Sequence, residues 1–526
     1  MNILGLTHPM AWNNAACLVV GGDLVRMIEE ERLNRFKFSS RVPPRLSIEA
    51  CLAAGDATLD DVDLIAVGWE AGNRQKRKKR FPWNFLARLL PFDIEDPRIR
   101  FVRHHLSHAI ASYYLSGYPQ ANVISLDAYG GSESGVLGVG DGAEFRILKT
   151  VPTKGSWGWI YSEVTKALGF RFHADEGKVM GLASYGEPDM EGVDFVDWDR
   201  DVPLIDRTRF RRFAAELPRR RKGEEIVDDH RRAAATIQAV LGRGVRRMAA
   251  YLHGVSGFEA LCLSGGCALN CAVNGEILRE PTVARLYINP APHDLSSAVG
   301  AALWAHKEAT GERPVEVLHH AHLGPAYTDE AVEAVLVDVG VASWRKAEDI
   351  CDEAARRLAE GEVVGWFQGP MEFGPRALGG RSILADPRDP ALADRVNAIK
   401  GREPWRPLAP SIQEEEAPRL FDDWCPSPFM LIAFQANDTC RSEIPGVVHV
   451  DGSVRAQTVS RETQPGFHSL LGAFRERTGV GALLNTSFNV AREPIVCTPR
   501  DALMTFYSSG LDALVLGRWL VEKQPR

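Results

Sequence analysis

The chain has 526 residues, which is too long for one ordinary hydrophobic core, so about two to four domains are expected. Hydrophobic residues make up 45% and charged residues 25%, as in soluble globular proteins. The net charge of −7 argues against a nucleic-acid-binding surface, and no apolar run approaches the ~18 residues of a membrane span. The N-terminus lacks the features of a signal peptide, and nine scattered cysteines without a CxxC pair indicate reduced thiols and a cytoplasmic protein.

The first half of the chain predicts short strands that alternate with helices. Each expected strand is apolar or β-prone and ends at small, polar or acidic residues. Two of the expected helical segments differ in character, since one is highly charged and the other has clear helical periodicity. The strands are Ile3–Thr7, Ala15–Val20, Val123–Leu126 and Leu261–Leu263; the helical segments are Arg207–Arg232 (charged), Ala233–His253 (periodic) and Ser296–His306 (Ala-rich).

The pattern of expected elements changes near residue 345. An amphipathic helix is expected from about Ala347 to Glu360, then a strand at 363–367 and a loop rich in Gly, Pro and Arg. We therefore predict two domains, 1–345 and 346–526. The basic run at 74–80 is interpreted either as a solvated face or as a contact to an anionic partner.

Three histidines lie in the sequence HHLSHA at 104–109. His104 and His108 are four residues apart, so on a helix they share one face, a spacing that suits two imidazoles on one metal ion. A surface helix can also carry such a pair by chance. His105 points elsewhere and is interpreted either as a packing residue or as one that supports a ligand from behind.

Two carboxylates follow or precede predicted elements where they can face a site. Asp127 ends an apolar strand, and Asp294 stands just before a predicted helix. The alternative for each is a cap of a helix or turn, and for Asp294 considered alone that alternative is the stronger one.

Small residues at strand ends suggest a nucleotide site. Ser264, Gly265, Gly266 and Asn270 lie between a buried strand and a likely helix, where backbone N–H groups can approach phosphate closely. Gly130 belongs to a similar loop, and Lys178 lies in a third Gly-containing segment. The plain alternatives are strand-to-helix turns and a surface lysine.

The C-terminal part gathers arginines in loops fixed by Gly and Pro. Arginine forks bind phosphate or carboxylate through two hydrogen bonds, so rigid loops that hold several of them favour a small anionic ligand. One or two of these arginines are expected instead to pair with Glu372, Asp386 or Glu403. The basic residues are Arg376, Arg381, Lys400, Arg402, Arg406 and Arg455, followed by Asn485 and Ser487 as polar donors.

Taken in this order, these motifs resemble the O-carbamoyltransferases of the NodU/CmcH type over nearly the whole chain. The combination is specific although no single motif is. The motifs are HHLSHA (104–109), GKVMGLASYG (177–186), SGGCALN (264–270), EFGPRALGGRSILADP (372–387), REPWRPLAPS (402–411) and NTSFN (485–489).

The resemblance implies an α/β protein with two domains. The first is similar to the universal tRNA threonylcarbamoyl-transferase protein, with a duplicated actin-like/sugar-kinase (RNase H-like) fold, and the second is YrdC-like. The second domain is expected to hydrolyse carbamoyl phosphate and to join the carbamate to ATP with Mg²⁺, giving carbamoyl-adenylate and pyrophosphate. The first domain is expected to transfer the carbamoyl group to a hydroxyl-bearing small molecule, which could be a sugar, a macrolide, an ansamycin or a small polar metabolite.

The resemblance also implies roles for individual residues. His104, His108, Asp127 and Asp294 match metal ligands, with Fe²⁺ favoured and Zn²⁺ or Mn²⁺ as alternatives. His8 matches a histidine near the acceptor hydroxyl, where a general base is useful because an alcohol is a poor nucleophile. Lys400, Arg406, Arg455, Asn485 and Ser487 match the carbamoyl-phosphate pocket, and Arg376 and Arg381 are assigned to ATP.

The sequence departs from the family in places and leaves alternatives. The family often reads GHDASA where this chain has THPMAWNNAA at 7–16, and Ala128 follows Asp127 where a glycine is common. One alternative is a phosphotransferase or ATPase with the same first-domain fold. A second is a tRNA-modifying enzyme, and a third is a ligand-binding protein without activity. The segment Phe81–Ile99 either borders the acceptor site or is a surface loop, and an oligomer is possible.

Overall fold

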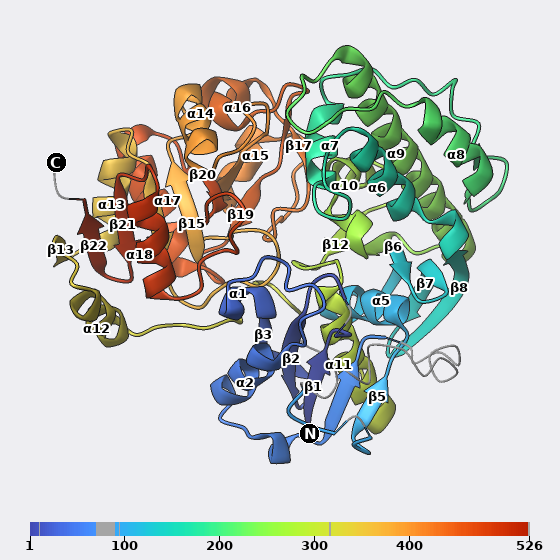
Figure 1. The fold of residues 1–526 in the computed structure, drawn as a ribbon, viewed down its shortest axis with the longest axis horizontal. Coiled ribbons are helices and arrows are strands. Elements are labelled where there is room, and N and C mark those ends of the chain that lie inside the picture. The colour runs from blue at the N-terminus through green and yellow to red at the C-terminus, as the bar shows by residue number, and fades with distance from the viewer. Residues whose placement is uncertain (10, 70–89, 94, 315–316, 524–526) are drawn as a thin grey trace. The chain divides into compact units, whose positions relative to one another are not determined.

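The computed structural model, which describes residues 1–9, 11–69, 90–93, 95–314 and 317–523, divides into two compact units (Figure 1). Unit 1 consists of Met1–Glu30 and Ser39–Leu318, and unit 2 consists of Glu31–Phe38 and His319–Arg526. The basic run at 74–80 and most of 81–99 lie outside the described residues.

The division after Leu318 differs from the cut predicted near residue 345. Residues 319–345 belong with the second unit because their elements pack there. Strand β13 (Trp344–Lys346) pairs antiparallel with β22 (Trp519–Glu522), and helix α12 (Asp329–Val339) packs against α18 (Pro499–Ser508). The change of sequence pattern near residue 345 therefore coincides with β13, an edge strand of unit 2.

Unit 1 contains the same sheet arrangement twice. The first sheet has the order β3-β2-β1-β4-β5, and the second has the order β8-β7-β6-β11-β12. In each, three successive strands are antiparallel and two later strands continue the sheet in parallel. The strands are β1 (Asn2–Leu6), β2 (Ala15–Val20), β3 (Asp23–Glu29), β4 (Leu64–Val67), β5 (Ile99–Phe101), β6 (Gln120–Gly130), β7 (Glu133–Asp141), β8 (Glu144–Pro152), β11 (Ala260–Ser264) and β12 (Arg285–Ile288). The duplication expected from the sequence is therefore present.

Helices α5 (His104–Leu115) and α11 (Leu295–Thr310) pack together between these sheets (Figure 1). Their approach is very close at Gly300, where an added Cβ would lie 1.7 Å from the carbonyl oxygen of Ser107. Gly5 in β1 similarly has no room for a Cβ beside Ala298. Small residues at these contacts bring the N-terminal end of α11 next to the first turns of α5, which is where the site described below is built.

Among the remaining helices of unit 1, α2 (Arg45–Ala54) packs on β2 and β3 of the first sheet, and the others lie on the side of the second sheet. The charged segment predicted as helical over Arg207–Arg232 is interrupted, because Leu217 is extended before Pro218, as proline disfavours helix in the residue before it. The predicted strand at 123–126 is longer than expected and runs to Gly130. The helices are α2 (Arg45–Ala54), α6 (Trp157–Ala167), α7 (Glu176–Ala183), α8 (Arg207–Glu216), α9 (Asp228–Ser256) and α10 (Cys271–Leu278), with a small β9 (Val196–Asp197)–β10 (Leu204–Ile205) pair.

Unit 2 is built on an eight-stranded mixed sheet in the order β13-β22-β21-β14-β15-β20-β16-β19. Its core includes the fully buried Trp366, Leu384, Phe474, Leu483 and Val515. The other strands are β14 (Val364–Phe367), β15 (Arg381–Ala385), β16 (Ala409–Gln413), β17 (Phe434–Gln435), β18 (Ser453–Val454), β19 (Gln457–Val459), β20 (Ala482–Ser487) and β21 (Ala513–Leu516); the helices are α13 (Ile350–Ala359), α14 (Pro390–Ile399), α15 (Ala417–Leu420), α16 (Asp438–Glu443) and α17 (Pro465–Thr478). Both units are α/β, as predicted. Among the described residues no helix is long and apolar enough to span a membrane.

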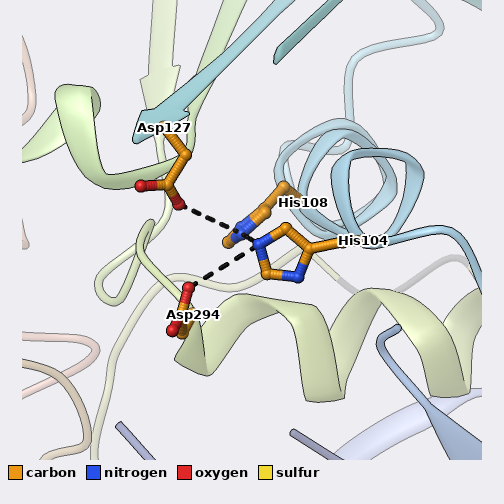
Figure 2. Close-up of side chains that lie close together, drawn as sticks. All are labelled: His104, His108, Asp127 and Asp294. Carbon is orange, nitrogen blue, oxygen red and sulfur yellow. Dashed lines mark hydrogen bonds and ion pairs between the residues drawn. The ribbon is translucent and has the colours of Figure 1, made fainter. Parts of the chain in front are cut away.

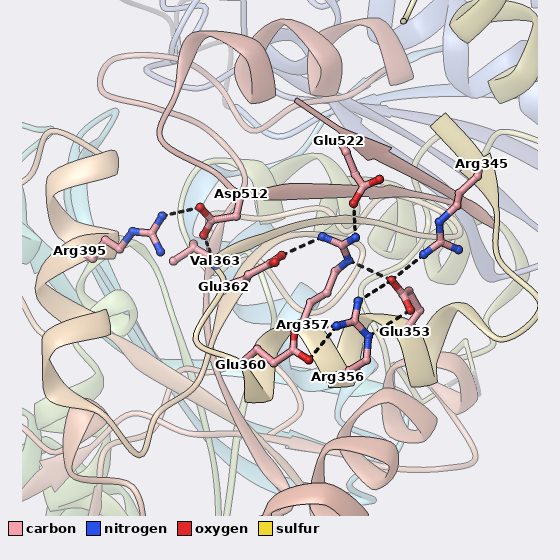
Figure 3. A network of polar contacts seen from close by, with 10 residues as sticks. All are labelled: Arg345, Glu353, Arg356, Arg357, Glu360, Glu362, Val363, Arg395, Asp512 and Glu522. Atoms are coloured by element: carbon pink, nitrogen blue, oxygen red, sulfur yellow. Dashed lines mark hydrogen bonds and ion pairs between the residues drawn. The ribbon is translucent and has the colours of Figure 1, made fainter. Parts of the chain in front are cut away.

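An ion-pair network fastens α13 to the edge of this sheet (Figure 3). Glu353 accepts hydrogen bonds from Arg345, Arg356 and Arg357, so one carboxylate serves three guanidinium groups. Arg357, only 9% exposed, also contacts Glu522 at the end of β22. The network therefore joins the helix to the edge strand β13 and to its neighbour β22.

Candidate metal centre and cationic cluster

Four side chains from three elements of unit 1 point at one another (Figure 2). His104 and His108 come from the first turns of α5, Asp127 from β6, and Asp294 from the residue before α11. The two Nε2 atoms are 3.0 Å apart; His108 Nε2 is 3.6 Å from Asp127 Oδ2, and His104 Nε2 is 3.6 Å from Asp294 Oδ1. One donor atom from each residue lies within 4.8 Å of all the others.

In each imidazole, a neighbouring oxygen atom determines that the proton is on Nδ1. His104 Nδ1 lies 3.1 Å from the carbonyl oxygen of Gly68, which can only accept, so Nδ1 carries the proton. His108 Nδ1 lies 2.7 Å from Ser296 Oγ, whose own hydrogen is directed to backbone carbonyls. Both Nε2 atoms therefore present lone pairs to the same gap, the arrangement found around bound metals.

Burial shifts every group of this set toward its neutral form. It lowers the pKa of His104 and, with the neighbouring His104 as a second cause, holds the pKa of His108 well below its usual value. Burial raises the pKa of Asp127 to about 6, with Asp294 as a further cause, and it raises the pKa of Asp294 to about 6. Within the described chain, Asp127 Oδ2 is buried without a hydrogen-bond partner. Two lone-pair nitrogens and two destabilised carboxylates fit a divalent cation.

The strand and loop geometry explains why the carboxylates reach this point. The pairing of β6 with β7 is irregular between Leu126 and Gly130, and such a bulge re-aims the side chain of Asp127. An added Cβ at Gly130 would lie 2.2 Å from the His104 ring. The glycine therefore leaves room for the imidazole of His104. His105, by contrast, is turned toward the carbonyl of Glu133 at 3.2 Å, so it lies outside the set, as expected.

His8 lies beside this centre. Its ring is 5.0 Å from the ring of Trp69, which in turn is 4.9 Å from that of His104. The loop that follows His8 reaches Asp294, because the backbone N–H of Trp12 donates to Asp294 Oδ2 at 3.1 Å. Burial, and then the proximity of His104, lower the pKa of His8 to about 3, so the ring is neutral at pH 7.

The glycine-rich residues predicted at strand ends surround the same centre. Gly265 has a left-handed φ of 77°, and a Cβ there would lie 2.2 Å from the carbonyl oxygen of Leu126. A Cβ on Gly266 would lie 3.0 Å from Asp127 Oδ1, and Ser264 Oγ donates to the carbonyl of His108. The loop thus packs directly against two of the candidate ligands.

Two other predicted nucleotide contacts have local partners. Asn270 caps α10 by accepting from the N–H of Val273, and it exchanges side-chain hydrogen bonds with Gln238. Lys178 lies 3.8 Å from Asp175 and above the ring of Phe170. These contacts account for both side chains in the ligand-free fold.

Unit 2 brings together a second group, here called the cationic cluster: Arg376, Lys400, Arg402, Arg406 and Arg455. Burial holds the pKa of Arg402 well below its usual value, and the charges of Arg406, Arg455 and Arg376 lower it further. Burial and the charges of Arg402 and Arg406 likewise depress the pKa of Lys400. Like charges that converge under burial are costly unless an anion joins them.

Polar groups next to the cluster are placed for a ligand. Lys400 Nζ donates to oxygens of Ser487 and Asn489, which fixes the strand end that carries Ser487. Asn485 donates to Ala377 O and Ser411 Oγ, while its Oδ1 is buried without a hydrogen-bond partner in the described chain. Arg402 is the member that the sequence pattern placed nearby but did not assign, although its spacing between Lys400 and Arg406 offered the signal.

Arg381 has a different environment from the one expected for an ATP contact. It is fully buried, and its guanidinium donates to the carbonyls of Gln368, Gly369, Gly380 and Pro325. Its guanidinium carbon also lies 3.6 Å from the centre of the Phe367 ring. Arg381 therefore holds the shape of the 368–380 loop, and only Arg376 of the predicted ATP pair belongs to the cationic cluster.

The duplicated sheet of unit 1 with its candidate metal centre and the mixed sheet of unit 2 with its cationic cluster define an α/β protein with two candidate sites. The family described as the carbamoyltransferase N-terminus matches residues 85–303, and the carbamoyltransferase C-terminus matches residues 355–523. The chain belongs to the carbamoyltransferase family and is an enzyme of that type, as the sequence motifs predicted.

Two similar proteins come from nodulating bacteria. Nodulation protein NolNO of Sinorhizobium fredii is 38% identical over 99% of this chain and 81% of its own length. Nodulation protein NolO of Bradyrhizobium diazoefficiens is 39% identical over 81% of this chain and 79% of its own length. Among solved structures, full-length HypF in the phosphate- and nucleotide-bound form is similar at 12% identity and a TM-score of 0.38, covering 59% of this chain and 56% of that one.

Proposed function

We propose that the chain is an ATP-dependent O-carbamoyltransferase that makes carbamoyl-adenylate from carbamoyl phosphate and transfers the carbamoyl group to a hydroxyl of a small-molecule acceptor. The observation that carries the proposal is Arg402. Its pKa is lowered by burial and by the charges of Arg406, Arg455 and Arg376, against the opposing charge of Glu403, and an anionic substrate with a phosphate group would balance the excess of positive charge.

The first step is assigned to unit 2. Carbamoyl phosphate is held by Lys400, Arg406, Arg455, Asn485 and Ser487, and Arg402 adds a further positive charge. Hydrolysis releases phosphate and carbamate, and a carbamate oxygen then attacks the α-phosphorus of ATP, so that the bond to pyrophosphate breaks. Arg376 is assigned to the phosphates of ATP, and Arg381 keeps the loop in place from behind.

The second step is assigned to unit 1. The acceptor hydroxyl attacks the carbamoyl carbon, its proton passes to the neutral His8 ring, and AMP leaves. A divalent ion held by the two histidines and two aspartates would supply Lewis acidity and a template for the nucleotide phosphates, with Fe²⁺ favoured over Zn²⁺ or Mn²⁺. Gly130, Ser264, Gly265, Gly266, Asn270 and Lys178 are assigned to the surroundings of the nucleotide.

The experiment that tests the first step needs no acceptor. The purified protein is incubated with ATP, Mg²⁺ and either carbamoyl phosphate or inorganic phosphate, and pyrophosphate, AMP and ADP are quantified. We expect pyrophosphate only with carbamoyl phosphate. ADP release that ignores carbamoyl phosphate would instead indicate a phosphotransferase or ATPase.

Variants make the same assay specific for the cationic cluster. Arg455→Ala should raise the carbamoyl phosphate concentration needed for half-maximal pyrophosphate release. Arg461→Ala, which removes an exposed arginine of the same unit, is the matched control and should behave as the parent chain. An equal effect of both substitutions would contradict the assignment.

A further inference from the structure

Three uncharged side chains of unit 2 form a chain of hydrogen bonds next to the 368–380 loop; they are called here the amide relay. The relay consists of Gln457 on β19, Ser411 on β16 and Asn485 on β20, and each residue is at most 1% exposed. Strand β16 lies between β19 and β20, and Ser411 pairs with Gln457 while Ala409 pairs with Asn485. The three side chains therefore project from the same face of the sheet.

The direction of the relay is set at Gln457. Its Nε2 donates to the carbonyl oxygen of Leu378 at 3.0 Å. A carbonyl oxygen only accepts, so the amide nitrogen faces Leu378 and Oε1 faces the other way. Oε1 accepts the hydroxyl hydrogen of Ser411 at 2.6 Å. This bond uses the single hydrogen of Ser411, whose Oγ is left as an acceptor.

The relay ends at Asn485 and fixes the orientation of its amide. Asn485 Nδ2 donates to Ser411 Oγ at 2.8 Å and to the carbonyl oxygen of Ala377 at 3.1 Å, which uses both amide hydrogens. A reversed amide would place Oδ1 against the Ala377 carbonyl and beside a hydroxyl with no hydrogen left to donate. Oδ1 therefore points away from these partners, and it is buried without a hydrogen-bond partner among the described residues.

Asn485 Oδ1 is an acceptor beside a group of donors. Asn485 and Ser487 are two residues apart on β20, so their side chains share a face, and Ser487 Oγ lies 3.3 Å from Lys400 Nζ of the cationic cluster. The lysine and arginines of the cluster only donate hydrogen bonds. A fully ionised phosphate group can accept from them but has no hydrogen for Asn485. A ligand that pairs with both has an anionic group and an N–H group.

We propose that the amide relay makes unit 2 select a carbamoyl group over an acyl group, with Asn485 Oδ1 accepting a hydrogen from the NH₂ of carbamoyl phosphate and with Gln457 and Ser411 as positioning residues. This inference rests on the proposed function and deepens it, since it names the atom that recognises the carbamoyl group and the residues that orient that atom. Acetyl phosphate carries a methyl group in place of the NH₂. It would leave Oδ1 buried and unpaired, which is the strongest means by which a site rejects an analogue.

The test compares two stable phosphonates that differ only at this group. Phosphonoacetamide carries NH₂ where 2-oxopropylphosphonate carries CH₃, and neither contains the labile P–O bond of carbamoyl phosphate. Isothermal titration calorimetry on the full chain, without ATP, gives the Kd of each. We expect phosphonoacetamide to bind about 10- to 100-fold more tightly, the range for a buried acceptor that is otherwise left unpaired.

The positioning role is tested by substitutions that do not touch Asn485. Gln457→Met keeps the length of the side chain but removes the acceptor of the Ser411 hydrogen, so Ser411 can donate to Oδ1 of a reversed Asn485 amide. The ratio of the two Kd values should fall at least about threefold, while the Kd of 2-oxopropylphosphonate stays that of the parent chain. Ser411→Ala breaks the relay at its middle and should lower the ratio as well.

The control is a second buried glutamine of the same sheet. Gln413 on β16 is 4% exposed, and its Nε2 donates to the carbonyl of His468 rather than to the relay. Gln413→Met should therefore keep the parent ratio. Each variant is also its own reference, because a general loss of structure weakens the binding of both phosphonates and leaves their ratio unchanged.

The outcomes distinguish this inference from the proposed function. Equal binding of the two phosphonates by the parent chain, or a parent ratio in both Gln457→Met and Ser411→Ala, would overturn the relay. Binding of neither phosphonate would overturn it together with the assignment of carbamoyl phosphate to the cationic cluster. A preference for phosphonoacetamide that depends on Gln457 and Ser411 supports the relay. If the same chain released no pyrophosphate from ATP and carbamoyl phosphate, the carbamoyl-adenylate step alone would be refuted.

Discussion

The Nε2 atoms of His104 and His108 lie 3.0 Å apart, and neither carries a hydrogen to share. Gly68 and Ser296 take the protons on the opposite nitrogens, so the two lone pairs face each other across a gap bordered by Asp127 and Asp294. Two lone pairs at this separation repel unless a positive charge lies between them. The contact is therefore best understood as one edge of a cation site.

Metal analysis gives the first prediction. The purified chain should contain about one divalent transition-metal ion, and His108→Ala should lose it. Retention should also fall as the pH drops through about 6, because protons then compete with the metal for Asp127 and Asp294, whose pKa values are both raised to about 6. Elemental analysis after dialysis measures both effects. His105→Gln is the matched control in the same turn of helix, and metal loss in that variant as well would refute the ligand set.

The second prediction concerns Ser296, which touches no expected ligand other than His108. Ser296→Ala removes the acceptor that fixes the proton on Nδ1, so metal affinity should fall about 10- to 100-fold, as for other residues that orient metal ligands. Competition with a chelator gives the affinity. Ser116→Ala, which removes a buried serine that donates to the carbonyl of Tyr113 at the far end of α5, should bind metal normally. Equal affinity of the two variants would mean that the tautomer is set elsewhere.

Much of this site could be predicted from sequence, but its supporting atoms could not. The spacing of His104 and His108 placed them on one helical face, and Asp127 was expected at a strand end, since both patterns are local. Gly68 O and Ser296 Oγ act through the packing of α5 against distant segments, which no local pattern reveals.

The second unit shows the same limit in another form. Its arginine-rich loops predict a site for an anion, which stays a prediction. Residue type alone could not separate Arg381, which donates to backbone carbonyls, from Arg402, which has other arginines as neighbours. The compact units divide after Leu318 rather than near 345, because β13 pairs with β22 from the far end of the chain.

The third prediction separates the two chemical steps through His8. Its pKa is lowered to about 3 by burial and by His104, so the ring is unprotonated throughout the neutral range, and it can take the acceptor proton only as the hydroxyl attacks. His8→Ala should reduce carbamoyl transfer to an acceptor by about 10²- to 10⁴-fold, the usual contribution of a general base. Pyrophosphate release without acceptor should persist. His319→Ala, an exposed histidine, is the control. An equal loss of both steps in His8→Ala would contradict its role.

The fourth prediction concerns stability and pH. Burial works to raise the pKa of Glu353, but hydrogen bonds from Arg356 and Arg357 outweigh it and bring the pKa down to about 2. A folded-state pKa below the unfolded value stabilises the protein above the unfolded pKa, and the contribution is lost as the pH falls toward the folded one. Glu353→Gln should therefore lower the free energy of unfolding by about 1 kcal/mol at pH 7, and by progressively less below pH 4.5. Urea titrations at several pH values measure this, with Glu476→Gln, an exposed glutamate of unit 2, as the control. A difference that is constant with pH would exclude the network as its source.

The last prediction is that Arg402 lowers the stability of the ligand-free protein and contributes to the binding of carbamoyl phosphate. In the ligand-free fold, burial and three neighbouring arginines work against its charge, so Arg402→Met should raise the melting temperature by about 2–4 °C, which corresponds to about 1 kcal/mol for a domain of this size. The same variant should gain less stability from added carbamoyl phosphate than the parent chain does, since binding to the folded state stabilises it in proportion to affinity. Arg402→Lys keeps the positive charge. It should therefore raise the melting temperature less than Arg402→Met does, and it should keep more of the stabilisation by carbamoyl phosphate. Thermal unfolding with and without carbamoyl phosphate measures both quantities. A lower melting temperature for Arg402→Met, together with an undiminished response to carbamoyl phosphate, would mean that Arg402 is a structural residue and that the charge of the cluster is balanced within the fold.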